Sequence, residues 1–355
     1  MRIVLFSEAL TPPFDEGIKN VAHSLLVALR KRHDVLALTN KGPKPPAPGI
    51  ERLPANRLLW SHRLRWRIDG FRPELVVYLP TACATPLSFV RTWLLHYYGR
   101  RAPTAMVALQ PRTYRRAARM LIPRLAVGPV WAQGRRTAEP LRELGVPVLR
   151  LPPAVDTDRF RPADVAEKVA LRSRYGLATD RPVLLHVGHL NPNRNVPALT
   201  GLRAVSDAQV VLVGSTSTPA DEATVEALRA AGVRVIAEVQ PTIEDLYRLA
   251  DAYVFPVRSD TGCIDAPLSV LEAMACGLPV VSTRYDALPR LFPDAAGVYY
   301  YEGEDELRRQ AARALADGAP DNRRLVLGMT WDAAAEALVE GSLGGEERTG
   351  WTASE

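Results

Sequence analysis

One stretch of the sequence, residues 251–286, alternates strand, loop, helix and strand within a short length of chain. It begins with an apolar, β-rich run at Ala252–Phe255, continues through a polar loop, and reaches an apolar helix at residues 268–276. Gly277 ends that helix, and residues 279–283 form a second buried strand. A strand, a helix and a strand in such close succession are typical of a parallel sheet with a crossover helix. The stretch therefore predicts an α/β fold.

The polar loop before this helix predicts an anion-binding site. The free N–H groups at a helix start and the positive end of its dipole both point toward such a loop. Glu272 is the one charged residue of the helix and cannot face its apolar side, so we expect it to project toward the same loop. A merely solvated Glu272 on an ordinary strand–helix unit is the alternative, and on this geometry alone the two interpretations are equally supported.

Charge divides the chain into two unlike halves. Its 355 residues suffice for two domains, and 47% hydrophobic with 24% charged residues is usual for a globular protein. Residues 1–150 hold 25 Lys and Arg against 9 Asp and Glu, whereas the rest holds 20 against 30. We expect the first half to meet an anionic membrane surface or a phosphorylated molecule, with an incidental arginine-rich surface as the alternative. Nucleic acid is not expected, because no recognition motif accompanies the basic residues.

The sequence also predicts where the protein works. No apolar run reaches the roughly 18 residues that a membrane-spanning helix needs, and Met1 leads into a strand rather than a signal peptide. Cys83, Cys263 and Cys276 lack the spacing of a disulfide framework or a metal site, which favours reduced thiols. We therefore expect a cytoplasmic protein without a metal site, with peripheral attachment to the inner face of the membrane as a further option.

Both halves repeat the α/β pattern. The first starts with a strand at Arg2–Ser7 and a helix at residues 17–32, the beginning of a doubly wound sheet. Its loop lacks G-x-G-x-x-G, so a nicotinamide or flavin cofactor is not expected.

Residues 56–71 interleave Leu and Trp with four Arg and suit either an anionic lipid surface or, as we favour, a core-packing helix with a basic outer face. The proline-rich residues 148–162 predict a linker. Further strands are expected at 35–38, 75–79, 104–109, 126–132, 182–187, 208–213 and 233–236, and further helices at 87–98, 135–144, 195–206, 220–231, 242–249, 302–316 and 329–341.

Several segments, in chain order, resemble the retaining GT-B glycosyltransferases of the large family numbered 4, the glycosyl transferases group 1. LEAMACGLPVVST is nearly the family consensus, and LPPAVDTDRF is similar to its interdomain "P-N-G-V-D-x-x-x-F" segment. VGHLNPNRN resembles the strand–loop "V-G-R-L-x-P-E-K-G". Residues 15–20 resemble the N-terminal Gly loop, residues 241–256 resemble the segment before the donor loop, and Trp331 with its helix resembles the final segment. Together these matches cover most of the chain.

The resemblance implies the GT-B fold, two Rossmann-like doubly wound parallel-sheet domains that face a central cleft. We expect residues 1–152 to form the acceptor-binding domain, 153–165 a linker and 166–328 the nucleotide-sugar donor domain. Residues 329–342 would then form a helix that crosses back to the first domain, and residues 343–355 a polar tail.

The resemblance also implies an activity. The family moves a sugar from a nucleotide diphosphate to an acceptor with retention at the anomeric carbon, without a metal ion or a cofactor, and the leaving phosphate is thought to take the acceptor proton. Combined with the basic first half, this predicts a hexosyltransferase whose acceptor is a carbohydrate, lipid-linked or phosphorylated. The alternative is a catalytically impaired relative that binds a sugar nucleotide or a partner, because several positions depart from the family pattern.

Carried over by position, the resemblance gives each site residue a role. Glu272 would bind the ribose hydroxyls, and Arg194 stands where the family has a diphosphate-binding Lys. His189 stands where it usually has Arg, and Gly17 would let the first-domain backbone approach the phosphates. A plain surface cation and a satisfied loop histidine are the alternatives for Arg194 and His189. The expected donor-binding residues are Gly17, Gly188, His189, Arg194, Pro267, Leu268, Ser269 and Glu272.

Two positions depart from the family. Its leading acidic residue, eight positions before Glu272, is Ile264 here, and we expect the adjacent Asp265 to take over that role. The histidine that the family places after the strand at 104–109 is missing; Gln110 lies there, and His96 sits on the preceding helix. The candidate catalytic residues are Asp265, Arg194 and Gln110.

Overall fold

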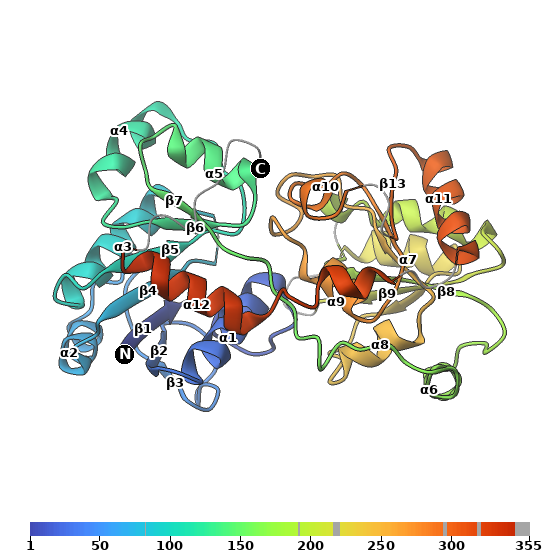
Figure 1. Cartoon of the computed structure of the whole chain (residues 1–355), viewed down its shortest axis with the longest axis horizontal. Helices are drawn as coiled ribbons and strands as arrows, with labels where there is room; N and C mark the ends of the chain where they lie inside the picture. The colour runs from blue at the N-terminus through green and yellow to red at the C-terminus, as the bar shows by residue number, and fades with distance from the viewer. Residues whose placement is uncertain (82, 191, 216–220, 294–296, 318–320, 345–355) are drawn as a thin grey trace. The chain divides into compact units, whose positions relative to one another are not determined.

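The chain folds into two compact units (Figure 1). The computed structural model describes the whole chain except residues 82, 191, 216–220, 294–296, 318–320 and 345–355. Unit 1 comprises Met1–Pro153, Ile264–Ala266 and Trp331–Glu355, and unit 2 comprises Ala154–Cys263 and Pro267–Thr330. Most of the polar tail expected at residues 343–355 lies outside the described residues.

Unit 1 is built on a seven-stranded sheet of order β3-β2-β1-β4-β5-β6-β7, in which every pair of neighbours is parallel. From β1 the next strands along the chain, β2 and β3, add to one side of the sheet, and β4 to β7 add to the other. This is the doubly wound arrangement that the sequence predicts. The strands are β1 (Arg2–Ser7), β2 (Asp34–Thr39), β3 (Ile50–Arg52), β4 (Leu75–Leu79), β5 (Thr104–Val107), β6 (Val130–Ala132) and β7 (Val148–Arg150).

Helices cover both faces of this sheet. One face buries apolar side chains of α2 (His62–Phe71), α3 (Pro86–Tyr98), α4 (Arg116–Leu125) and α5 (Arg135–Arg142). Elsewhere in the unit α1 (Gly17–Arg30) packs against α12 (Trp331–Ser342), although α12 follows unit 2 in the sequence. Ion pairs of 2.8 Å, one between Lys31 and Asp332 and one between Arg32 and Glu336, reinforce that contact.

Unit 2 has a six-stranded parallel sheet of order β10-β9-β8-β11-β12-β13. Its strands are β8 (Val183–Gly188), β9 (Gln209–Gly214), β10 (Arg234–Ile236), β11 (Ala252–Phe255), β12 (Val280–Ser282) and β13 (Val298–Tyr300). Its helices are α6 (Val165–Arg174), α7 (Glu222–Ala230), α8 (Ile243–Leu249), α9 (Leu268–Ala275), α10 (Leu288–Leu291) and α11 (Glu304–Ala316), with the 3-10 helices η1 (Pro192–Arg194), η2 (Val196–Ala204) and η3 (Asp321–Leu325).

Some local predictions were wrong. The helix expected at 195–206 is the 3-10 helix η2, whose Pro197 and Gly201 are poor α-helix residues. Residues 148–162, expected to be a linker, begin with β7, which is too short to show a period. Helix α6 was missed although Asp164 caps it by accepting a hydrogen bond from the Glu167 N–H at 2.8 Å. The short elements β3, α10 and β13 were missed as well.

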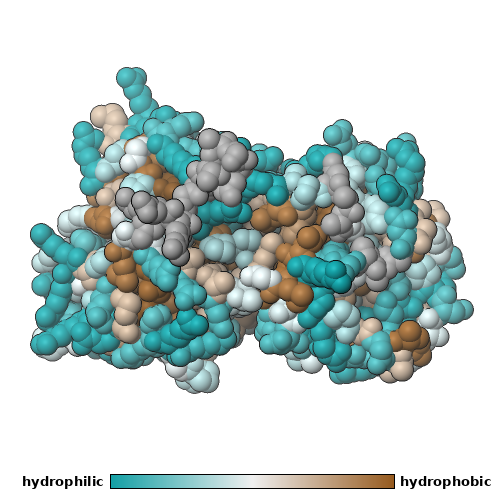
Figure 2. Space-filling model, viewed as in Figure 1, coloured by the Kyte–Doolittle hydropathy of each residue, from teal (hydrophilic) through white to brown (hydrophobic). Residues whose placement is uncertain are grey.

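Hydrophilic residues cover most of the visible surface of each unit, and apolar residues form smaller patches among the hydrophilic ones (Figure 2). In the part of the chain that the structure describes, no helix combines the length and the apolar character needed to cross a bilayer. Both observations agree with the composition.

Candidate functional site

The carboxyl end of β8 carries a buried histidine. His186 is inaccessible to solvent, and its Nδ1 lies 2.8 Å from the carbonyl oxygen of Val254. A carbonyl only accepts hydrogen bonds, so the proton is on Nδ1 and Nε2 is left as an acceptor. Nε2 has no hydrogen-bond partner within the described residues. Burial lowers the pKa of His186 to about 3, so the ring is neutral near pH 7.

A buried arginine lies beside this histidine. Arg194, in η1, is 7% exposed, and it makes no ion pair with a carboxylate among the residues described. A Cβ added to Gly188 would lie 3.0 Å from the His186 Nε2 and 3.4 Å from the Arg194 Nη1. The imidazole and the guanidinium therefore converge on Gly188. A buried cation without a counter-charge lowers the stability of the protein, so Arg194 favours the binding of an anionic ligand here.

A row of aromatic rings connects this point to Glu272. The ring of His186 stacks on Tyr253 with centroids 6.2 Å apart, and Tyr253 stacks on Tyr247 at 5.8 Å. The Tyr247 hydroxyl donates a hydrogen bond of 2.7 Å to the Glu272 Oε2. The Tyr253 hydroxyl donates a hydrogen bond of 3.2 Å to the carbonyl of Val187 at the end of β8. The stacked rings therefore hold His186, which lies beside Arg194, in a fixed position relative to the Glu272 carboxylate.

Glu272 is nearly buried and titrates near neutral pH. It is 8% exposed, and burial raises the pKa of its carboxyl group to about 7, although the hydrogen bond from Tyr247 and the charge of Arg159 oppose this rise. Helix α9 begins after Pro267, which gives it no side-chain cap, and Leu268 at its start is buried. The first turn of α9 therefore combines uncapped N–H groups with a carboxyl that changes charge near neutrality.

The predicted site residues are divided between the units. Gly188, His189, Arg194, Pro267, Leu268, Ser269 and Glu272 belong to unit 2, whereas Gly17, Gln110 and Asp265 belong to unit 1. His189 is half-buried next to Gly188 in the chain. The sequence reasoning missed His186, although its signal was present as the one polar side chain inside the apolar strand VLLHVG.

Asp265 holds a helix of unit 1. Its buried carboxylate accepts hydrogen bonds from the Gly134 N–H at 2.9 Å and the Thr137 hydroxyl at 2.8 Å, at the start of α5. Its own N–H donates to the Leu109 carbonyl at 2.8 Å. Both carboxylate oxygens therefore bind groups at the start of α5. This contact gives Asp265 a structural role, and its catalytic role stays a prediction.

The other unit 1 positions follow strands or begin helices. Gly17 is the first residue of α1, and a Cβ there would make only an ordinary contact of 3.5 Å with Ile264. Gln110 is half-buried three residues after β5. His96 lies 3.1 Å from both the Ala102 carbonyl and the Thr104 hydroxyl, which marks it as part of the packing of unit 1. The structure thus gives His96 no place among the site residues.

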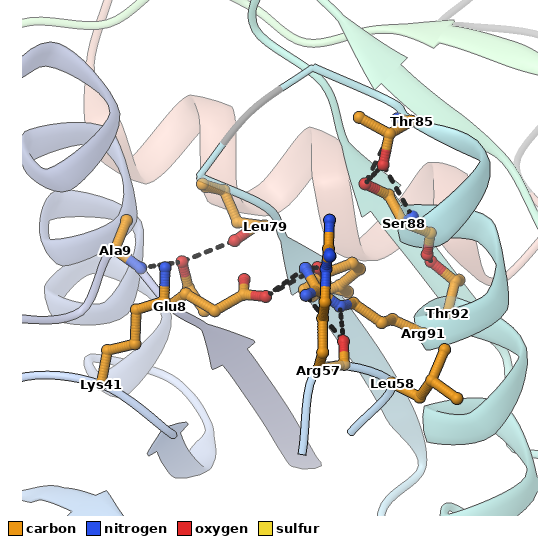
Figure 3. Close-up of polar contacts among 12 residues, drawn as sticks. Glu8, Ala9, Lys41, Arg57, Leu58, Leu79, Thr85, Ser88, Arg91 and Thr92 are labelled. Carbon is orange, nitrogen blue, oxygen red and sulfur yellow. Dashed lines mark hydrogen bonds and ion pairs between the residues drawn. The ribbon is translucent and has the colours of Figure 1, made fainter. Parts of the chain in front are cut away.

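A buried ion pair lies at the carboxyl end of β1 (Figure 3). The Glu8 Oε1 accepts a hydrogen bond of 2.7 Å from the Arg91 guanidinium on α3 and one of 3.1 Å from the Tyr78 hydroxyl. Arg91 also donates to the carbonyl of Arg57 at 2.8 and 2.9 Å. The Glu8 Oε2 is buried and has no partner within the described residues. That oxygen is a free hydrogen-bond acceptor at the sheet edge where such folds bind ligands.

No group of three or more His, Cys, Asp or Glu side chains within the described part of the chain is arranged to hold a metal ion. In unit 2, the buried atoms without a hydrogen-bond partner among the described residues include the His186 Nε2 and the Arg194 Nε. Such groups suit a ligand with both phosphates and hydroxyls.

The sequence of this chain is similar to those of known glycosyltransferases. Residues 181–317 match the family model described as glycosyl transferases group 1. The D-inositol 3-phosphate glycosyltransferase of Xylanimonas cellulosilytica is 32% identical over 216 residues, which are 54% of this chain and 49% of that protein. A GDP-mannose-dependent monoacylated alpha-(1-6)-phosphatidylinositol monomannoside mannosyltransferase of Corynebacterium glutamicum is 28% identical over 217 residues, 53% of this chain and 54% of that protein.

Likeness to solved structures extends over almost the whole chain. The sucrose-phosphate synthase of Thermosynechococcus elongatus superposes with a TM-score of 0.74 at 19% identity, covering 97% of this chain and 98% of that one. This likeness confirms the predicted α/β fold with two parallel-sheet units, the GT-B fold. In sequence, by contrast, the chain spans about half the length of the curated relatives that it matches.

Proposed function

We propose that this chain, whose residues 181–317 form a glycosyl transferases group 1 domain within a GT-B fold, is a retaining glycosyltransferase. It moves a sugar from a nucleotide-diphosphate donor to an acceptor that is phosphorylated or lipid-linked. The observation that carries the proposal is the buried Arg194, which has no carboxylate partner within the described residues. A diphosphate supplies the counter-charge that this cation lacks.

The rest of the donor is recognised by α9. The uncapped N–H groups of Leu268 and Ser269 face the negative charge of the phosphates, as helix starts commonly do. Glu272 in its charged form accepts hydrogen bonds from the two ribose hydroxyls. The name of the mannosyltransferase from Corynebacterium glutamicum includes GDP-mannose, so a nucleotide sugar has a precedent among the relatives.

The transfer breaks the bond between the anomeric carbon and the phosphate oxygen and forms the bond to the acceptor oxygen on the same face of the sugar. The acceptor proton goes to the leaving phosphate. Arg194 and the start of α9 stabilise the negative charge that develops on the diphosphate, which is worth about 2–4 kcal/mol per donor by analogy with an oxyanion hole. No pair of carboxylates is needed for this route.

The acceptor is expected at unit 1. Residues 1–150 carry a large excess of positive charge, with 25 Lys and Arg against 9 Asp and Glu, which suits a phosphorylated or lipid-linked molecule. The free Glu8 Oε2 accepts a hydrogen bond from an acceptor hydroxyl. The relatives' names include D-inositol 3-phosphate and phosphatidylinositol monomannoside, which agree with this class.

The proposal also covers metal dependence and location in the cell. Transfer proceeds without a resident metal ion, so added EDTA should leave the rate unchanged. The protein is cytoplasmic and meets the membrane peripherally, through the basic first unit.

A thermal-shift screen of UDP-, GDP- and ADP-sugars tests the donor site. A true donor at 100 times its dissociation constant should stabilise the protein by roughly 2.7 kcal/mol. Arg194→Met should remove that shift and lower turnover about 10²- to 10³-fold. Arg229→Met, which alters an exposed arginine of α7 in the same unit, is the matched control and should keep both.

Three results decide the proposal. Loss of the shift in Arg194→Met but not in Arg229→Met supports it. No shift with any nucleotide sugar contradicts it. A shift without transfer or hydrolysis would favour instead an impaired relative that only binds the sugar nucleotide.

A further inference from the structure

Three neighbouring helices of unit 1 expose large apolar side chains. Helices α2, α3 and α4 lie side by side on one face of the sheet (Figure 1), and their inner residues, such as Leu64, Phe89 and Ile122, are fully buried. The opposite surface of these helices and the loop before α2 form what we call the aromatic–arginine face. Its exposed apolar residues are Leu58, Trp60, Trp66, Trp93, Tyr97, Met120 and Leu121, with Trp66 83% exposed.

Some aromatic residues of this face contact one another and a neighbouring arginine. Trp93 and Tyr97 stack on α3 with centroids 6.3 Å apart and planes within 8°. The guanidinium carbon of Arg65, on α2, lies 5.3 Å from the centre of the Tyr97 ring. A cation held over an aromatic ring joins the two helices at the surface. The face is therefore continuous from α2 to α3 rather than a set of isolated side chains.

The charge of this region is mostly positive. Residues 57–124 contain 13 arginines and no lysine, against two acidic residues. Arg67, Arg91 and Arg119 pair with Glu51, Glu8 and Glu143, which lie outside this range. Both acids are engaged, Asp69 with Arg100 at 2.6 Å and Glu74 with the backbone N–H of Arg2 at 2.8 Å. By contrast, the exposed arginines 63, 65, 115 and 116 make no ion pair within the described residues. This excess of positive charge favours an anionic partner.

We propose that the aromatic–arginine face docks on the surface of an anionic lipid bilayer. Indole and phenol rings favour the boundary between headgroups and acyl chains, while arginine stems lie along apolar surface and place their guanidinium groups at phosphates. The aliphatic Leu58, Met120 and Leu121 extend the apolar contact. This assignment rests on the proposed function, in which the basic first unit meets the membrane, and it names the face of that unit that makes the contact.

Other occupants fit the face less well. A second copy of the chain would bring two arginine-rich patches together, because a twofold interface pairs a surface with itself. Nucleic acid would satisfy the arginines and stack on the tryptophans, but it offers nothing to Met120 and Leu121, which are 62% and 45% exposed. A bilayer accommodates the cations, the rings and the aliphatic side chains together.

Flotation with lipid vesicles tests the proposal. One set is pure phosphatidylcholine, and the other contains equal parts of phosphatidylcholine and phosphatidylglycerol. The wild type should float only with the second set, and added salt should weaken its binding. Trp60→Ala with Trp66→Ala should weaken binding about tenfold or more. Arg63→Glu with Arg116→Glu should weaken it about 30-fold or more, at roughly fivefold per arginine.

The control variants alter exposed residues of unit 2. Val165 is 81% exposed and Arg229 is exposed on α7, so Val165→Ala and Arg229→Glu match the two kinds of change and should bind vesicles like the wild type. The donor-induced thermal shift should be unchanged in all variants, because none of them alters a donor-site residue. A lost shift would therefore report on the proposed function or on folding rather than on the membrane face.

Several outcomes would overturn the proposal. One is equal flotation with both vesicle sets, and another is equal binding by the face variants and the controls. If the face variants lose binding to single-stranded RNA while vesicles are not bound at all, the face is a nucleic-acid surface. If the wild type dimerises and the face variants are monomers, the face is an interface between copies of the chain.

Discussion

The two sheets carry opposite kinds of buried charge at the carboxyl ends of their strands. In unit 1, after β1, the carboxylate of Glu8 is paired with Arg91 and hydrogen-bonded to Tyr78. In unit 2, after β8, the guanidinium of Arg194 is also buried but makes no ion pair within the described residues, and the neighbouring Nε2 of His186 has no partner there. One centre is largely satisfied by the protein, and the other is not.

This difference separates structural charge from ligand-binding charge. A buried ion pair keeps its own geometry, so removing one partner mainly damages the fold. A buried cation without a counter-charge costs stability in the free protein, so removing it mainly damages ligand binding. Substitutions at each centre separately test this difference.

The largest expected effect is on the folding of unit 1. Arg91→Met leaves the Glu8 carboxylate buried without its cation and should lower the free energy of unfolding by about 3–5 kcal/mol. Chemical denaturation measures this. Arg67 pairs with Glu51 at 2.6 Å in an exposed setting, so Arg67→Met is the control and should cost less than about 1 kcal/mol. Similar losses in the two variants would show that the Glu8–Arg91 pair is no more structural than a surface pair.

A smaller effect is the pH dependence caused by Glu272. Because burial raises the pKa of its carboxyl to about 7, the folded protein holds this proton more tightly than the unfolded chain does. The resulting stability is fully present below about pH 4.5 and is lost as the pH rises to about 7, by up to about 3 kcal/mol. Glu272→Gln should remove this slope from denaturation curves measured across the range.

Glu222 provides the matched control for that experiment. It is exposed on α7 in the same unit, so Glu222→Gln should leave the pH slope unchanged. A slope that persists in Glu272→Gln would show that another group causes it.

The smallest effect concerns how Tyr247 tunes Glu272. If charged Glu272 binds the ribose hydroxyls, nucleotide affinity should rise as the pH passes through about 7. Tyr247→Phe removes the hydrogen bond that holds this pKa down, so the rise should move to higher pH and stability should fall by about 1 kcal/mol. Calorimetric titration of UDP and GDP at several pH values measures the shift. An unmoved midpoint would argue that Glu272 does not contact the nucleotide.

Much of the fold could be predicted from the sequence because its causes are local. The strand at Ala252–Phe255 and the helix after it are marked by apolar runs, Gly277 and Pro279, and the observed α9 and β12 agree within a residue or two. Short strands such as β3 and β13 could not be found, because three residues are too few to show a period. The start of α9 after Pro267 was predictable for the same local reason, whereas the role of Glu272 stays a prediction.

The sequence by itself therefore determined the alternation of strands and helices, the division into a basic and an acidic half, and the segments that resemble a known family. Only the tertiary structure decided which polar groups are partnered. It joined Glu8 to Arg91, 83 residues away, and Asp265 to Gly134, 131 residues away. It left the Arg194 Nε and the His186 Nε2 without hydrogen-bond partners in the described chain. Pairing of this kind depends on contacts between distant segments and on burial, and neither is encoded in the local pattern of residues.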